Sequence, residues 1–162
     1  MPAGISCSLA RPRICLLVGL PGSGKSTYLK QLGVSVLSSD AIRALLIDDP
    51  TNQTIHSRVF GTLRYLLRQR LELRRPVTYI DATNLTRKDR RTYIKTAELH
   101  DAAIEAIFFD TPEEVCMQRN ASRNRVVPPE AIADMARRFQ PPSFEEGFFR
   151  ITVIHPHSGR GA

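Results

Sequence analysis

Short apolar segments alternate along the chain with longer segments in which apolar residues recur at helical spacing. Runs rich in β-branched and aromatic residues predict strands at Ile14–Val18, Val34–Ser38, Val77–Asp81, Ala103–Phe109 and Phe149–Ile154. The helical pattern predicts helices near Thr27–Leu32, Ala41–Ile47, Ile55–Arg74, Thr86–His100, Pro112–Asn120 and Pro128–Phe139. Because strands and helices alternate throughout, we expect an α/β fold with one parallel sheet flanked by helices.

Local signals support several of these boundaries. Thr86 and Asp89 have the spacing of a capping box, which predicts a helix start. Thr111 precedes Pro112, so we expect Thr111 to cap the next helix with a proline at its first position. Gly33 follows the first helix and predicts its end.

The segment GLPGSGKS at Gly19–Ser26 lies between the first predicted strand and the first predicted helix. It matches G-x-x-x-x-G-K-[ST], the phosphate loop that binds nucleoside triphosphates. Glycines let the backbone approach a ligand, and successive N–H groups hold phosphate oxygens at the positive end of the helix. Lys25 would reach the β- and γ-phosphates, and the Ser26 hydroxyl would bind Mg²⁺. The expected cofactors are therefore ATP (or GTP) and Mg²⁺, and the predicted nucleotide-binding residues in this segment are Gly22, Ser23, Gly24, Lys25, Ser26 and Thr27.

Two aspartates follow predicted strands, Asp40 after the second and Asp81 at the end of the third. Ligands of parallel sheets bind beyond the carboxyl ends of the strands, so both aspartates should meet the phosphate loop in one cleft. Asp81 is expected to hold Mg²⁺, although a turn-capping role would also fit. Asp40 is expected to orient an acceptor hydroxyl and take its proton, with Arg43 placed to bind an anion of the acceptor. A helix-start acid with an i, i+3 ion pair is the alternative for these two residues.

Arginines cluster between the last two predicted helices, at Arg119, Arg123 and Arg125, among small polar residues. Arginine side chains stabilise the charge that develops on a transferring phosphoryl group. We therefore predict a mobile lid in which Arg119 and Arg123 contact the nucleotide. A solvated basic loop is the alternative.

The net charge of +7, from 23 basic and 16 acidic residues, favours a polyanionic partner such as nucleic acid. Six arginines occur in residues 58–75 and five basic residues in residues 87–95. If these helical faces lined the cleft entrance, they could follow the backbone of a bound strand. A basic enzyme whose arginines serve ATP, with the helical arginines on solvated surface, would also explain the charge.

Length and composition indicate a single domain, residues 1–162, with an ordered core of about 13–155. Cys7, Cys15 and Cys116 are expected to be free thiols in a reducing compartment. No apolar run is long enough for a signal peptide or a membrane span, so we expect a cytoplasmic protein without membrane contact.

Other residue types that often carry chemistry are sparse. His155 and His157 lack a third ligand nearby, which argues against a structural zinc site, and the remaining histidines are isolated. Tyr28, Phe60 and Phe148 are expected in the core rather than as base-stacking surfaces, because the chain has few aromatics with which to build a core.

With the phosphate loop, Ser38–Arg43, Asp81–Asn84 and Arg119–Arg125, the chain resembles the kinase module of polynucleotide 5′-hydroxyl kinases, above all that of the bacterial end-healing enzymes. The resemblance runs from about Arg13 to Ile154. It implies a P-loop NTPase fold of the adenylate-kinase type, with a central parallel five-stranded sheet and an arginine-rich lid.

The same resemblance implies a role for each site residue. Lys25 and Ser26 would bind the ATP phosphates and Mg²⁺, and Asp81 would assist the metal. Asp40 would be the general base for a 5′-OH of DNA or RNA, while Arg43 would hold a phosphate of the acceptor strand. Arginines of the lid would contact the donor, so the implied catalytic residues are Lys25, Asp40, Arg43 and Arg123.

The resemblance also implies partners. The bacterial module usually sits beside phosphatase and ligase domains, for which this chain has no room, so it could be an excised domain or a free-standing relative. A nucleic acid 5′-OH end is the expected acceptor. The same residues would equally serve a kinase for a small-molecule hydroxyl (nucleoside, sugar or antibiotic), and a non-catalytic nucleotide-binding module is the third possibility.

Overall fold

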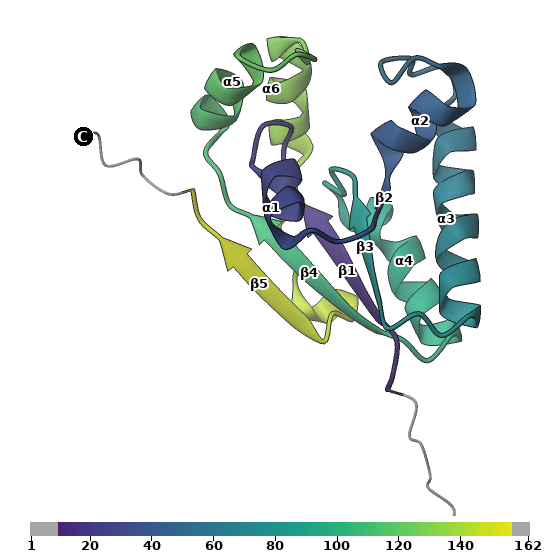
Figure 1. The fold of residues 1–162 in the computed structure, drawn as a ribbon. Coiled ribbons are helices and arrows are strands. Elements are labelled where there is room, and N and C mark those ends of the chain that lie inside the picture. The colour runs from purple at the N-terminus through teal and green to yellow at the C-terminus, as the bar shows by residue number, and fades with distance from the viewer. Residues whose placement is uncertain (1–9, 157–162) are drawn as a thin grey trace, which may run out of the picture.

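Parallel strands form one sheet in the computed structural model, which describes residues 10–156. The strand order is β2-β3-β1-β4-β5 (Figure 1). The pairing places Ile14 opposite both Thr78 and Ile104, which centres β1 between β3 and β4. The bounds are β1 Arg13–Val18, β2 Val36–Ser38, β3 Val77–Asp81, β4 Ala103–Phe109 and β5 Arg150–Ile154.

Six α-helices and one short 3₁₀ helix connect these strands in the described part of the chain. Their bounds are α1 Lys25–Leu32, α2 Ser39–Ile47, α3 His56–Glu72, α4 Arg87–Leu99, α5 Glu113–Ala121, α6 Pro129–Arg138 and the 3₁₀ helix η1 Phe144–Glu146. The helices α3 and α4 pack on one face of the sheet and α1 packs on the other. In Figure 1, α2, α5 and α6 stand beyond the carboxyl ends of the strands.

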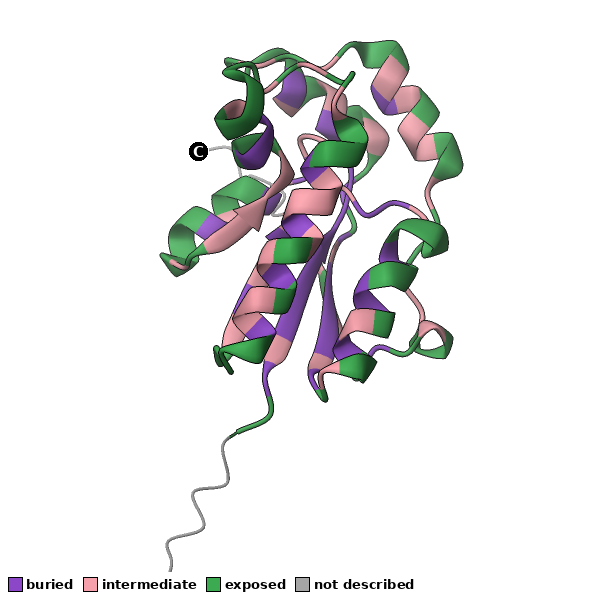
Figure 2. Ribbon diagram, turned by 90° about the vertical axis from the view of Figure 1, so that its right-hand side faces the viewer, coloured by how far each residue is buried: buried purple, intermediate pink, exposed green. Residues whose placement is uncertain are grey.

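Alternation along β1 places its side chains in two apolar layers. Leu16 belongs to the larger core, which includes Leu63 of α3 and Ile94 of α4. Leu17 belongs to a smaller core with Leu29 of α1. Figure 2 shows the buried strands between helices that turn their exposed faces outward. The packing therefore confirms the predicted α/β fold with a parallel sheet of five strands.

Several boundaries differ from the prediction. The second strand begins only at Val36, because Gly33 adopts a left-handed conformation that ends α1 and the chain needs two residues to reach the sheet. The expected cap by Thr111 is wrong: Pro112 is the N-cap of α5, and the Thr111 hydroxyl instead donates to the Ser23 carbonyl at 3.0 Å. The predicted capping box at the start of α4 is confirmed.

Two thiols among the described residues are buried and free, Cys15 and Cys116, while Cys7 lies outside residues 10–156. Burial and the neighbouring Glu105 raise the pKa of Cys15 to about 12, which leaves it unreactive. Within the described range no helix is long and apolar enough to cross a membrane. His155 is part of no group of three metal-ligating side chains there, and His157 lies outside that range.

Candidate functional site

A cleft with a volume of about 1060 Å³ lies beyond the carboxyl ends of the strands. The end of α2 that carries Asp40 and the start of α3 form one wall, and α5 and α6 form the other (Figure 1). The structure brings every predicted site residue into the lining of this cleft, namely Gly22, Ser23, Gly24, Lys25, Ser26, Thr27, Asp40, Arg43, Asp81, Arg119 and Arg123.

Lys25 lies at the start of α1 with only 8% of its surface exposed. Its Nζ donates to the carbonyl oxygens of Gly19 at 2.7 Å and Leu20 at 2.9 Å, so the loop wraps around the ammonium. Burial lowers the pKa of Lys25 to about 8, against the opposing pull of the Asp81 carboxylate. A polyphosphate beside this ammonium would raise the pKa again by favouring the charged form.

The backbone of α5 at Cys116 packs directly on the phosphate loop. Gly22 has φ 81°, and a Cβ added there would lie 2.5 Å from the Cys116 carbonyl oxygen. A Cβ at Gly24 would lie 3.6 Å from Nη1 of Arg119, which places this guanidinium beside the loop. Glycine is therefore required at Gly22 both for the left-handed backbone and for the close approach of α5.

Asp40 lies in the first turn of α2, which Ser38 caps by accepting from the Ala41 N–H. Its carboxylate is bound by two arginines, Arg43 at 3.0 Å and Arg125 at 2.8 Å, yet its side chain remains 55% exposed. The i, i+3 ion pair that the sequence offered as an alternative is thus present. It is compatible with a functional role, since both partners line the cleft.

Arg43 is only 4% exposed, and its Nε is a buried donor without a hydrogen-bond partner among the described residues. A buried donor left unsatisfied is costly unless a ligand completes it. Because Arg43 also lines the cleft, it is suited to bind an anion there.

Asp81 ends β3 and is half-buried in the cleft. Burial raises the pKa of Asp81, while the Lys25 ammonium opposes this shift. Magnesium prefers oxygen ligands and binds through one or two protein groups, with waters and phosphates completing its shell. The hydroxyl of Ser26 and the carboxylate of Asp81 are oxygen donors lining one cleft, so the residues present fit this ion.

The loop between α5 and α6, where the sequence predicts a lid, is held by Asn120, a residue that the sequence reasoning missed. The buried Asn120 amide donates to the Val127 carbonyl at 2.6 Å and accepts from the Val127 N–H at 2.9 Å. These two bonds clamp residues 121–127 into a loop from which Arg123 and Arg125 reach the cleft. No spacing in the sequence signals this clamp.

The prediction that Tyr28, Phe60 and Phe148 contribute to the core is confirmed, because Phe148 belongs to the larger core and the other two rings pack against the apolar cores. Phe148 is buried in the core. Tyr28 and Phe60 are only half-buried, and both line the cleft. Tyr28 makes an edge contact with Phe109 at a ring separation of 5.5 Å. Also missed was His56, which lies against Phe60 on the cleft wall.

The expectation that the basic faces of α3 and α4 line the cleft entrance is wrong, since neither helix contributes an arginine to its lining. Arg70 of α3 instead donates hydrogen bonds to the Thr78 hydroxyl and to the Val77 carbonyl oxygen at the start of β3. Arg90 of α4 is fully buried in an ion pair with Glu146. These arginines have structural roles because acceptors on neighbouring elements draw their side chains inward.

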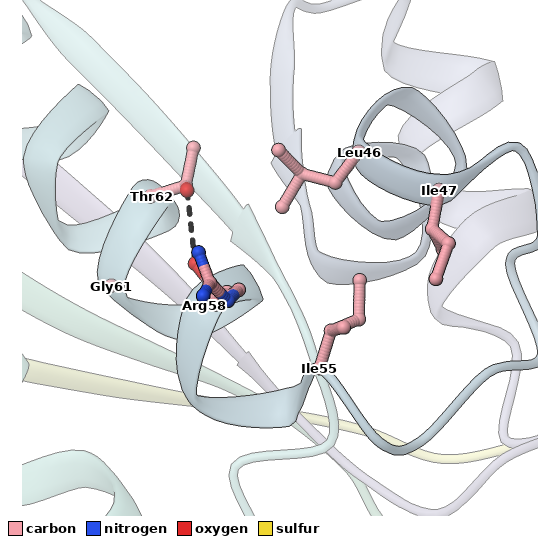
Figure 3. A pocket seen from close by; sticks show the side chains of 6 residues that line it. All are labelled: Leu46, Ile47, Ile55, Arg58, Gly61 and Thr62. Atoms are coloured by element: carbon pink, nitrogen blue, oxygen red, sulfur yellow. Dashed lines mark hydrogen bonds between the residues drawn. The ribbon is translucent and has the colours of Figure 1, made fainter.

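A second cavity of about 430 Å³ lies between the end of α2 and the start of α3 (Figure 3). Leu46, Ile47 and Ile55 are its apolar lining residues, and Arg58 is the charged residue among those that line it. Gly61 opens toward it, and a Cβ there would meet no atom within 4 Å. The cavity contains no group suited to catalysis.

Comparison with known proteins gives the following relations. A family model described as an AAA domain matches residues 14–142. The L-seryl-tRNA(Sec) kinase of Methanococcus maripaludis is 25% identical over 136 residues, 80% of this chain and 53% of that protein. The bifunctional polynucleotide phosphatase/kinase of Schizosaccharomyces pombe is 26% identical over 148 residues, 87% of this chain and 33% of that protein. The chain thus spans about half or less of the length of these relatives.

Solved structures show the same fold. A chain of the Pnkp1/Rnl/Hen1 RNA repair complex is 20% identical with a TM-score of 0.67, covering 84% of this chain and 46% of that one. A gluconokinase from Sinorhizobium meliloti is 17% identical with a TM-score of 0.60, covering 90% of this chain and 83% of that one. The fold is therefore that of the P-loop kinases.

Proposed function

The chain belongs to the AAA domain family that matches residues 14–142, and from this premise we propose that it is an ATP-dependent kinase that phosphorylates the 5′-hydroxyl ends of DNA or RNA. The observation that carries the proposal is the placement of Asp40 and Arg43 in the same cleft as the phosphate loop. A carboxylate that takes a proton and a buried arginine that binds an anion together suit an acceptor that carries both a hydroxyl and a phosphate.

In the proposed reaction the acceptor hydroxyl oxygen attacks the γ-phosphorus of ATP in line with the leaving oxygen of ADP. The carboxylate of Asp40 takes the hydroxyl proton as the new O–P bond forms. Lys25 and Arg123 stabilise the negative charge on the transferring group, and Arg119 holds the donor phosphates. Ser26 and Asp81 would hold Mg²⁺, which would neutralise negative charge on the nucleotide phosphates when bound.

Two relations support a polynucleotide acceptor. The cleft lining includes the buried Arg43, a cation suited to a phosphate of the acceptor strand, which an uncharged nucleoside or sugar would not need. The structural relatives include a chain from an RNA repair complex, and the curated relatives include a polynucleotide phosphatase/kinase. We further propose that residues 1–162 form a single kinase domain and that phosphatase and ligase domains act as its partners.

A second candidate is a kinase for a small-molecule hydroxyl. It is favoured by one observation: the likeness to the gluconokinase covers 83% of that chain, whereas the chain covers 46% of the RNA repair protein. The loop, Asp40 and Asp81 would serve either acceptor. A module that binds nucleotide without transfer is the third candidate.

Incubation with γ-labelled ATP and Mg²⁺ separates the three. We expect label on the 5′ end of a 5′-OH oligonucleotide, tested as DNA and as RNA, and none on the same oligonucleotide with a 5′-phosphate. Label on gluconate or a free nucleoside, with none on either oligonucleotide, would establish the small-molecule kinase instead. Nucleotide binding without transfer to any of them would establish the binding module.

A further inference from the structure

Two aromatic rings on the acceptor wall of the cleft have no part in the proposed phosphotransfer. His56 and Phe60 lie one turn apart at the start of α3, with ring centroids 4.5 Å apart and planes inclined by 37°. Phe60 is half-buried and packs against the larger core, and this contact holds its ring in place. His56 is exposed, so this ring is available to a ligand.

The position of the pair relates it to the acceptor rather than to ATP. Both rings line the cleft from α3, which packs against α2, the helix of Asp40 and Arg43. Thr51 and Gln53 line the same wall, and both are exposed. A flat aromatic surface bordered by hydroxyl and amide groups has the chemistry that binds a nucleobase, by stacking on its face and hydrogen bonding to its edge.

We propose that His56 and Phe60 form a stacking platform for the nucleobase of the acceptor's 5′-terminal nucleotide. The inference rests on the proposed function and narrows its substrate class, because a sugar acid or another acceptor without a π-face gains nothing from such a surface. Since every base has a π-face, the platform accepts all four bases. It fixes the terminal nucleotide while Asp40 takes the proton from the 5′-OH.

The test combines a change in the acceptor with a change in the protein. The acceptor is a 5′-OH oligonucleotide whose first nucleotide is either intact or abasic. For the unaltered protein we expect the abasic end to raise KM about tenfold, the effect of losing one stacked base, with kcat within about twofold. His56→Ala and Phe60→Leu should each raise KM for the intact end by a similar factor. In these variants, KM for the abasic end should then be close to KM for the intact end.

Tyr65→Leu is the matched control, because Tyr65 lies on the same helix, is exposed and is absent from the cleft lining. It should behave as the unaltered protein does. Phe60 contacts the core, so its variant is checked by thermal unfolding, whereas His56→Ala removes only an exposed ring.

Equal KM values for intact and abasic ends, or a full abasic penalty in His56→Ala, would overturn the platform while leaving the kinase assignment intact. Failure of the unaltered protein to label any oligonucleotide would overturn the proposed function, and the platform with it.

Discussion

Arg125 Nη1 lies 2.8 Å from Asp40 Oδ2, so the loop between α5 and α6, the predicted lid, touches helix α2 directly. Arg43 binds the other carboxylate oxygen at 3.0 Å. An acceptor hydroxyl that approaches Asp40 must therefore share this carboxylate with two guanidinium groups. The contact connects lid position to access at the proposed base, and it makes Asp40 the first residue to test.

Asp40→Asn should lower phosphotransfer by at least about 100-fold, since the loss of a general base typically costs two to four orders of magnitude. Affinity for a non-hydrolysable ATP analogue should change by less than about threefold, because Lys25 and the loop are untouched. Single-turnover transfer and a binding titration measure the two effects.

Asp134→Asn is the matched control for that substitution. Asp134 is 53% exposed and, like Asp40, binds two arginines, at 3.3 and 3.0 Å on α6. It lies outside the cleft lining, so its variant should keep full activity. Unchanged transfer by Asp40→Asn would remove Asp40 from the mechanism.

Nucleotide affinity should fall as pH rises through about 8. In the structure burial lowers the pKa of Lys25 to about 8, and a bound triphosphate raises it again by favouring the charged ammonium. Above pH 8, binding of the nucleotide is then coupled to the uptake of a proton by Lys25, so the affinity falls by up to tenfold per pH unit. Below about pH 7, Lys25 is already charged in the free protein and contributes no pH dependence to the affinity.

Titration of a non-hydrolysable ATP analogue between pH 7 and 9.5 measures this slope. Lys25→Arg provides the control, because an arginine stays charged throughout this range. Its affinity should be weaker but should lack the fall above pH 8. Equal affinity of the unaltered protein at pH 7 and pH 9.5 would contradict a lowered Lys25 pKa.

Gly22→Ala should weaken ATP binding at least tenfold. The new methyl group would need φ 81° and would lie 2.5 Å from the Cys116 carbonyl oxygen, so either the loop or α5 must move. Gly61→Ala is the contrasting variant, since its methyl group meets no atom within 4 Å and lies inside α3.

Replacement of a helical glycine by alanine stabilises by roughly 0.5–1 kcal/mol, so Gly61→Ala should raise the Tm by about 1–4 °C at full ATP affinity. Calorimetry and ATP titration compare the two glycine variants. Normal ATP affinity in Gly22→Ala would show that the loop tolerates the clash.

Local pattern was sufficient for most of the fold. The strands, the helices and the loop around Lys25 follow from periodicity and from one eight-residue motif, because both depend on neighbours in sequence. Convergence of Asp40 and Asp81 on that loop followed from the rule that parallel strands end at one edge of the sheet.

What the sequence left open depends on contacts between distant residues. The arginines at residues 87–95 look like a basic face, yet Arg90 is fully buried because Glu146 lies 56 residues further along. The clamp between Asn120 and Val127 and the exposure of His56 over Phe60 likewise arise only when the helices pack. Composition alone therefore assigned Phe60 to the core and missed its cleft-facing side.

Loss of one partner of the buried Arg90–Glu146 pair should destabilise the fold beside the site. Arg90 donates two bonds to Glu146, at 2.9 and 2.8 Å, and a third to the Asn84 carbonyl in the loop after β3. Removing one partner of a buried ion pair leaves an uncompensated charge and costs about 3–5 kcal/mol. Glu146→Gln should therefore lower the free energy of unfolding by about that amount in denaturant titrations.

The adjacent residue gives the control, because Glu145 pairs with Arg87 at 4.0 Å with both side chains exposed. Exposed pairs contribute less than about 1 kcal/mol, so Glu145→Gln should have little effect on stability. Equal losses in the two variants would mean that burial adds nothing to the Arg90 pair. A large loss confined to Glu146→Gln would establish that η1 anchors the loop after β3, and hence the floor of the cleft, through a single guanidinium.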